Sequence, residues 1–73
     1  MMHPVSSSNI RSIGYNEKNA TLTVEFCNNS MYEYYCVPQY VFEAFLCSPS
    51  KGMFHAEHIK SKYNYRKVKR AQS

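Results

Sequence analysis

The hexapeptide TLTVEF, residues 21–26, alternates strictly between polar and apolar side chains. Successive side chains of an extended chain point to opposite faces, so Leu22, Val24 and Phe26 share one face and the polar residues share the other. This period of two is typical of a β-strand with one face buried and the other in solvent. The segment therefore predicts a half-buried strand with which its neighbours must be in register.

The segment before this strand, residues 11–15, predicts a second strand in phase with the first. The polar sequence NEKNA between the two strands supplies a turn. A two-residue turn in the middle of this sequence pairs Tyr15 with Leu22 and Ile13 with Val24. All four side chains then lie on the same face of the sheet, as the register of a half-buried hairpin requires.

The loop CNNS after the first strand decides which way the following tyrosines point. With an even number of loop residues, Glu33 would pair with Val24 and face the core, where a carboxylate without a partner is costly. A three-residue loop over residues 28–30 directs Glu33 to solvent instead, and its asparagines tolerate the left-handed backbone such a loop needs. We therefore favour the three-residue loop.

In the favoured register, Phe26 pairs with Tyr32 and Val24 with Tyr34. Both tyrosines then point inward with the apolar residues of the neighbouring strand, because paired residues share a face. Tyr35 points outward by the same alternation. The motif YEY is accordingly predicted to be part of the core, and not an exposed platform on which bases stack.

Two helices are predicted after the third strand. Pro38 suits the first turn of a helix, and an apolar stripe follows at Val41, Phe42, Phe45 and Leu46. Ser48-Pro49 ends this helix and caps the next, with serine at the N-cap. A weaker stripe in the second helix comprises Gly52, Ala56, Ile59 and Tyr63. The order predicts an α+β fold: a three-stranded antiparallel meander with two C-terminal helices packed on one face.

The size and composition of the chain exclude several classes of protein. With 73 residues it forms at most one domain, which leaves no room for both a core and a large enclosed pocket. No paired-carboxylate, nucleophile–base or glycine-rich cofactor motif is present, so we expect no enzyme and no cofactor. The three cysteines form no disulfide or zinc pattern and indicate reduced thiols in the cytoplasm. No apolar run is long enough to span a membrane.

The charge of the chain is unevenly distributed. Residues 1–36 carry two basic residues against three glutamates, and residues 37–73 carry seven against two, for a net charge of +4. A basic C-terminal half favours an anionic partner such as nucleic acid. The alternative is a solvated tail that keeps the protein soluble.

Six short sequences occur in an order and spacing that resembles the KTSC domain. They are SSNIRSIGY (residues 7–15), YEY (32–34), VP (37–38), SKG (50–52), HIK (58–60) and YNYRKV (63–68). The second helix departs from the family pattern, since an asparagine is expected near Ala56 and an aromatic residue is more usual where His55 stands. The resemblance places a single domain at residues 7–68, between a flexible lead-in at 1–6 and a basic tail at 69–73.

The KTSC domain is named for its place at the C-terminus of some lysyl-tRNA synthetases, and it also occurs as a small free-standing protein, mostly in bacteria and phages. This context implies a non-catalytic module that binds nucleic acid, with RNA favoured over DNA. The candidate nucleic-acid-binding residues are the C-terminal cations with their interleaved rings: Lys51, Lys60, Lys62, Tyr63, Tyr65, Arg66, Lys67, Lys69 and Arg70. The alternative for this segment is that Tyr63 packs on the sheet and the last residues form a soluble tail.

A second class of function is a protein-interaction adaptor, such as a phage-borne inhibitor that docks on a host complex. Its candidate contact residues are the outward-facing Met31 and Tyr35. The sequence SPSKG could hold a phosphate at a helix N-terminus, although ordinary helix capping explains it as well. His55 and His58 lack a complete set of metal ligands, so no metal site is expected. The oligomeric state is left open.

Overall fold

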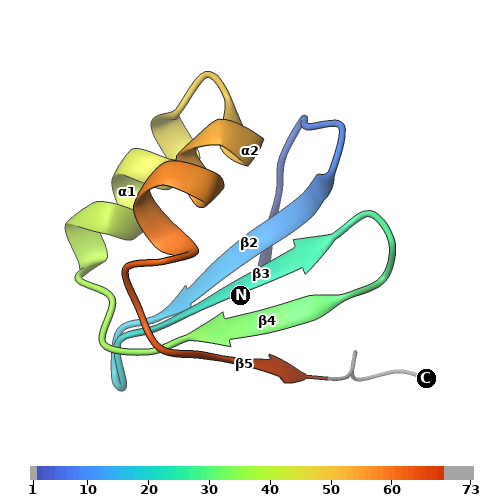
Figure 1. The fold of residues 1–73 in the computed structure, drawn as a ribbon. Helices are drawn as coiled ribbons and strands as arrows, with labels where there is room; N and C mark the ends of the chain where they lie inside the picture. Colours follow the sequence, from blue (N-terminus) through green and yellow to red (C-terminus); the bar gives the residue numbers. More distant parts are fainter. Residues whose placement is uncertain (1, 69–73) are drawn as a thin grey trace.

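The computed structural model describes residues 2–68 of the chain. α1 and α2 lie side by side over one face of an antiparallel sheet, and β5 lies next to β4 at one edge (Figure 1). In chain order the elements are β1 (Met2–Pro4), β2 (Ile10–Asn16), β3 (Thr21–Phe26), β4 (Met31–Tyr34), α1 (Gln39–Cys47), α2 (Lys51–Phe54), the π-helical turn η1 (His55–Ile59) and β5 (Tyr65–Val68).

The sheet has five strands in the order β1-β2-β3-β4-β5, all paired antiparallel. The α+β class is confirmed, but the predicted number of three strands is wrong. Both additional strands come from segments without clear hydrophobic alternation, a three-residue strand that ends in proline and the charged sequence YRKV. β1 lies inside the segment expected to be a flexible lead-in, and the predicted tail at 69–73 lies outside the described residues.

The first hairpin has the predicted register. Tyr15 pairs with Leu22 and Ile13 with Val24. The turn spans residues 17–20, and Ala20 has a positive φ of 55°. A bulge interrupts the pairing of β2 with β3 at its other end, where the register shifts between Ile10 and Ser12.

In the second hairpin the predicted faces are right and the predicted partners are wrong. Val24 pairs with Tyr32 and Leu22 with Tyr34, two positions away from the expected pairs. The Phe26 amide donates to the Ser30 carbonyl at 2.8 Å, so residues 27–29 form the loop and Asn29 has a φ of 72°. A shift of two residues leaves every side chain on its predicted face.

The core lies between the sheet and the helices. Its buried apolar residues are Ile10, Ile13, Leu22, Val24, Tyr34, Val37, Phe45 and Ile59. α1 supplies Phe45, which stacks on Phe54 of α2 with ring centroids 5.2 Å apart, and η1 supplies Ile59. The apolar stripe predicted for the first helix is therefore confirmed, since Val41, Phe42 and Leu46 also pack against this cluster.

The face of the sheet opposite the helices is less open than the alternation in β3 predicted. Ser12, Thr21 and Glu25 are each less than a tenth exposed. The Ser12 hydroxyl donates to Glu25 Oε1 at 2.9 Å across β2 and β3. β1 makes β2 an interior strand, so neighbouring side chains cover the small residues at its centre.

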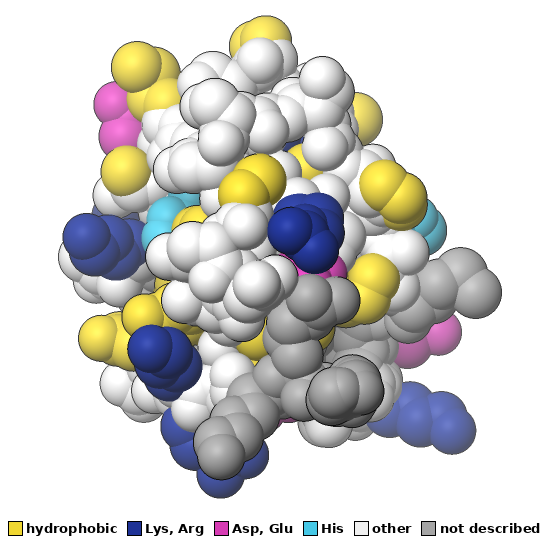
Figure 2. Space-filling model, turned by 90° about the vertical axis from the view of Figure 1, so that its right-hand side faces the viewer, with side chains coloured by type: hydrophobic (Ala, Val, Ile, Leu, Met, Phe, Trp, Pro, Cys, Tyr) yellow, Lys and Arg dark blue, Asp and Glu magenta, His cyan; other side chains and the backbone are white. Residues whose placement is uncertain are grey.

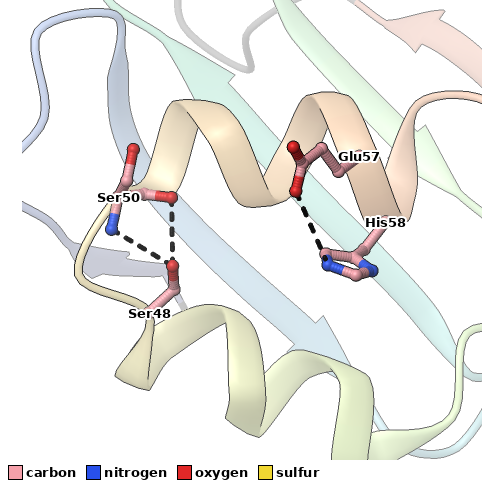
Figure 3. A network of polar contacts seen from close by, with 4 residues as sticks. All are labelled: Ser48, Ser50, Glu57 and His58. Atoms are coloured by element: carbon pink, nitrogen blue, oxygen red, sulfur yellow. Dashed lines mark hydrogen bonds and ion pairs between the residues drawn. The ribbon is translucent and has the colours of Figure 1, made fainter.

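The second helical segment begins later than predicted and is irregular. Its N-cap is Ser50, not Ser48, whose hydroxyl accepts from the Ser50 amide at 3.2 Å and donates to the Ser50 carbonyl at 3.0 Å (Figure 3). After one turn the helix widens into η1, where the Lys60 amide donates to the His55 carbonyl at 2.8 Å. Of the predicted stripe, Ile59 is buried, whereas Ala56 is exposed to solvent.

Candidate functional site

A cleft of about 400 Å³ opens where η1 faces β4 and β5. Its walls are largely aromatic, with the rings of Phe26, Tyr32, Tyr34, His55 and Tyr65. The volume falls at the lower end of the usual range for small-ligand sites, roughly 300–1,000 Å³. The helices thus cover one end of this face of the sheet and enclose the core, and the other end is left open as a cleft.

The sheet wall of the cleft follows from strand register. Tyr34 pairs with Tyr65 across β4 and β5, so both rings emerge on the same face, and Tyr32 lies two residues along the same strand. The Tyr34 and Tyr65 ring centroids are 5.6 Å apart, and those of Tyr32 and Tyr65 are 5.7 Å apart. Phe26 meets Tyr32 edge to face at 5.6 Å. These separations are typical of aromatic contacts.

The π-helical turn supplies the opposite wall. In a regular α-helix, residues five apart are rotated by about 140° around the axis, so His55 and Lys60 would point to different sides. The i to i+5 bond between them places both on the side that lines the cleft. Single π turns inside helices often occur at functional sites.

A hydrogen bond of 2.7 Å joins the Tyr34 hydroxyl to Nε2 of His55 across the cleft floor. Burial, with smaller contributions from Tyr32 and Tyr65, raises the pKa of Tyr34 to about 12. Burial and then the nearby Lys60 lower the pKa of His55 below 6.5. Both side chains are therefore uncharged at neutral pH, and the tautomer of His55 decides which of them donates in this bond.

The other described lining residues include no carboxylate. They are the small residues Gly52 and Ala56 and the polar residues Asn9, Asn28, Ser30 and Lys60. Asn9 reaches the cleft against Gly52 of α2, where an added Cβ would lie 3.0 Å from Asn9 Oδ1. That oxygen accepts a hydrogen bond of 3.1 Å from the Ser7 hydroxyl. The absence of a side chain at position 52 thus lets Asn9 pack closely on the helix.

The structure divides the predicted nucleic-acid-binding residues between different surfaces. Lys60 and Tyr65 line the cleft, and Lys67 pairs with Tyr32 and so shares its face. Arg66 points to the opposite face, where its guanidinium lies 3.8 Å from the carboxylate of Glu33.

Other predicted residues lie further from the cleft. The Lys51 ammonium donates to the Ser48 carbonyl at 2.5 Å within the α1–α2 turn. Lys62 and Tyr63 border a separate, smaller hollow beside Tyr35, and Tyr63 packs against the core. Lys69 and Arg70 lie outside the described residues. In the view of Figure 2 the described lysines and arginines are spread over the surface and do not form one large patch.

The predicted protein-contact residues are less exposed than expected. The Tyr35 hydroxyl donates to Glu33 Oε1 at 3.0 Å, and its ring is half-buried. Met31 is half-buried as well and pairs with Val68 of β5. Both therefore belong to a surface that β5 partly covers.

The chain is similar to proteins of one family over most of its length. The model of the KTSC domain matches residues 6–63. The crystal structure of a KTSC domain protein from Yersinia pestis has a TM-score of 0.90 and 40% identity, and the match covers 93% of this chain and 96% of that one. The chain belongs to the KTSC domain family. The resemblance stated from six short sequences is thereby confirmed.

Curated relatives of this KTSC chain differ in length. The lysine–tRNA ligase of Nostoc punctiforme is 39% identical over 59 residues, which are 81% of this chain and 10% of the ligase. An uncharacterized protein of Stutzerimonas stutzeri is 36% identical over 62 residues, which are 85% of this chain and 86% of that protein. The chain therefore spans about a tenth of the ligase it matches and most of the smaller relative.

Five of the six sequences by which the chain resembles the KTSC domain meet at the cleft. Asn9, Tyr32 with Tyr34, Gly52, Lys60 and Tyr65 come one after another from SSNIRSIGY, YEY, SKG, HIK and YNYRKV. From the sequence, Tyr32 and Tyr34 were predicted to be core residues and His55 was considered only as a metal ligand, while Asn9 and Phe26 were not selected. Among the missed residues only Asn9 belongs to one of these sequences, so the family pattern could have identified Asn9 but not Phe26 or His55.

Neither histidine of the HAEH sequence forms a metal site with its neighbours. His58 lies on the solvent side of η1, with Nε2 4.0 Å from the Glu57 carboxylate (Figure 3), whereas His55 bonds to Tyr34. Within residues 2–68 no three histidine, cysteine or carboxylate side chains come together as metal ligands. No helix in the described part of the chain has the length and apolar composition needed to cross a membrane.

Proposed function

We propose that this KTSC protein is a non-catalytic module that binds single-stranded RNA over its aromatic cleft. The observation that carries the proposal is the position of Tyr65, which is 55% exposed at the sheet edge and lines the cleft together with Lys60. Rings that stack on bases, next to cations that contact phosphates, are the usual means of binding single strands.

The distribution of charge supports the cleft face as the RNA-binding face. No glutamate lines the cleft, while Glu33 and Glu25 lie on the opposite face of the sheet. Lys60 and Lys67 both lie on the cleft side, where phosphates would meet no carboxylate of the sheet. A strand bound there avoids the like-charge repulsion that it would meet on the other face.

The relatives of the chain also support RNA as the ligand. Lysine–tRNA ligases act on an RNA, as their name states, and the ligase of Nostoc punctiforme contains a segment similar to this chain. Three free, exposed cysteines in the described chain are compatible with our proposal that the protein acts in the reducing cytoplasm.

The test is titration of the protein with single-stranded and duplex RNA, and with the matching DNA strand, at several salt concentrations. We expect single-stranded RNA to bind most tightly, with affinity falling as salt rises because counterions are released from the phosphates. Lack of binding at low salt would contradict the proposal. Binding that does not depend on salt would remove the phosphate contacts from it.

Two neighbouring residues of β5 provide a matched pair of variants. Lys67→Gln should weaken binding and reduce the slope of log affinity against log salt by about one. Arg66→Gln should have less effect, because Arg66 lies on the opposite face beside Glu33. A larger loss of affinity from Arg66→Gln than from Lys67→Gln would show that RNA binds the face of the sheet opposite the cleft.

The alternative function is a protein-interaction adaptor that uses the surface around Met31 and Tyr35. It is distinguished by capture of partners from a cell extract with and without nuclease treatment. A stoichiometric protein partner that survives nuclease, and that is lost in Tyr35→Ala but retained in Tyr65→Ala, would favour the adaptor over the RNA-binding module.

A further inference from the structure

We propose that the cleft between η1 and β4–β5 receives one unpaired base of the RNA strand, held against the rings of Tyr32 and Tyr65. This inference rests on the proposed RNA binding and adds the site and the part of the ligand that enters it. It concerns a base outside a duplex, because the stacked interior of a double helix offers no ring face to a protein cleft.

The shape and lining of the cleft suit a flat aromatic ligand. Its volume is about 400 Å³, its aromatic walls come from both the sheet and η1, and it is open to solvent on one side. Tyr32 and Tyr65 are inclined to each other by 52°, so a single ring can lie against one while its edge meets the other. Tyr65 is exposed enough to be covered by a base without rearrangement of the core.

Polar groups within the cleft can bind the edge of a base. Asn9 Oδ1 accepts from Ser7, and its Nδ2 group has no hydrogen-bond partner among residues 2–68, so it can donate to a ring nitrogen or carbonyl oxygen. The uncharged Tyr34–His55 pair closes the floor with a hydrogen bond already made. A small number of polar groups in an aromatic lining is the usual composition of a site for an organic ring.

Cations stand where the phosphates of the same strand would lie. Lys60 is part of the cleft wall on η1, and Lys67 lies across from it on β5, on the face of Tyr32. The backbone of an RNA strand that turns one base into the cleft can therefore contact a lysine on each side. Among residues 2–68, Lys60 is the only lining residue with an ordinarily charged side chain, so the site complements an anionic ligand.

The experiment blocks the cleft with a large side chain introduced at an exposed position of its wall. Ala56 lines the cleft and is exposed on η1, so Ala56→Trp should block the cleft without disturbing the buried core. Ala44→Trp is the matched control, because Ala44 is exposed on α1 and does not line the cleft. Far-UV circular dichroism and the unfolding midpoint verify that both variants are folded.

Each protein is titrated with oligouridylate, with an abasic ribose-phosphate strand of the same length, and with uridine monophosphate. The wild type and Ala44→Trp should prefer the strand that carries bases by about fivefold or more, as expected for one stacked base. Ala56→Trp should lose this preference and keep the salt-dependent binding of the abasic strand.

The outcomes separate this inference from the proposed function. If Ala56→Trp retains the full preference for bases, the cleft does not hold a base, whereas RNA binding itself stands. If the wild type binds neither the strands nor uridine monophosphate, RNA binding and the inference both fail. The wild type could also bind uridine monophosphate but neither strand, and lose this binding in Ala56→Trp. That result would support a pocket for a single base and contradict the proposed RNA binding.

Discussion

His55 illustrates how one backbone irregularity sets the chemistry of a side chain. The π turn that begins at this residue turns its ring toward the sheet, where it meets Phe26 at 5.2 Å and bonds to the Tyr34 hydroxyl. A regular helical period would not place His55 and Lys60 on the same wall. Asn9, in the loop before β2, packs closely on Gly52 and adds a polar side chain to the same cleft.

The lowered pKa of His55 predicts a specific pH dependence of stability. The folded protein binds fewer protons at this residue than the unfolded chain, whose histidine has the ordinary value of 6.5. The contribution of uncharged His55 to the folding free energy is therefore fully present above pH 6.5 and is lost as pH falls from 6.5 through the lower folded-state pKa. Urea unfolding at about pH 8 and about pH 5 measures this loss.

His55→Phe should reduce the loss of stability at acid pH, because it removes the titrating group and keeps a ring in place. His58→Gln serves as the control, since His58 is exposed on the outer side of η1. Equal pH dependence in the wild type and His55→Phe would show that another group is responsible.

At the scale of elements, α1 is attached to the sheet through a narrow contact. Phe45 is its one fully buried residue among those the structure describes, and it stacks on Phe54 of α2. The half-buried Phe42 stacks on Tyr15 at 5.2 Å, and the Tyr15 hydroxyl donates to the Val37 carbonyl at 2.6 Å. These contacts hold the helix layer in the position that leaves the cleft open.

Phe45→Ala should destabilise the protein by about 3–5 kcal/mol, because it removes a buried ring and leaves a cavity. A chain of this size has a total stability of roughly 4–11 kcal/mol, so the variant should lose a large share of its stability and melt at a much lower temperature. Tyr40→Ala, in the same helix at a position 72% exposed, should change stability by less than about 0.5 kcal/mol. Thermal unfolding of the two variants measures both losses of stability. Similar losses in Phe45→Ala and Tyr40→Ala would contradict the assignment of Phe45 to the core.

β5 is the second element with a defined role, since it covers the edge of β4 and supplies Tyr65 to the cleft. Its pairing partners on the cleft face are Tyr34 and Tyr32. Without β5 these rings would lose a neighbour and β4 would become an exposed edge, which favours association between chains.

Truncation after Asn64 should therefore increase self-association and lower the melting temperature by several degrees. In a domain of this size the melting temperature falls by about 4–8 °C for each kcal/mol of stability lost. Truncation after Val68 retains β5 and should have the smaller effect. Melting curves and light scattering after size exclusion measure both. Equal behaviour of the two truncated chains would show that β5 contributes little.

At the scale of the whole molecule, sheet and helices share one core. The Cα radius of gyration is 11.1 Å, close to the value of about 11 Å expected for a compact chain of this length. Buried residues from β2, β3, β4, α1 and η1 form a single cluster, so no layer has a core of its own.

We therefore expect one cooperative unfolding transition. Far-UV circular dichroism, which reports backbone structure, and tyrosine fluorescence, which reports ring environments, should give the same midpoint. Earlier loss of the fluorescence signal would show that side-chain packing is lost before backbone structure, and would contradict a single transition.

Local sequence determined the parts of this protein that depend on short-range periodicity. The alternation in β3 predicted its buried face, loop parity predicted that Tyr32 and Tyr34 point toward the helices, and the stripe of α1 predicted Phe45 in the core. These predictions hold because side-chain direction repeats every two residues in a strand and about every 3.6 in a helix.

Tertiary structure alone decided the extra strands, the π turn and the cleft. β5 forms by pairing with β4, from which both helical segments separate it in the sequence, whereas β1 pairs with β2, the next strand along the chain. The residues of β1 and β5 themselves show little alternation. The cleft depends on where the helix layer ends above β4 and on the rotation of His55 at η1, and neither is a local property of the chain. An inward direction was correctly predicted for the tyrosines, but only packing distinguishes an inward ring in the core from an inward ring that lines a site.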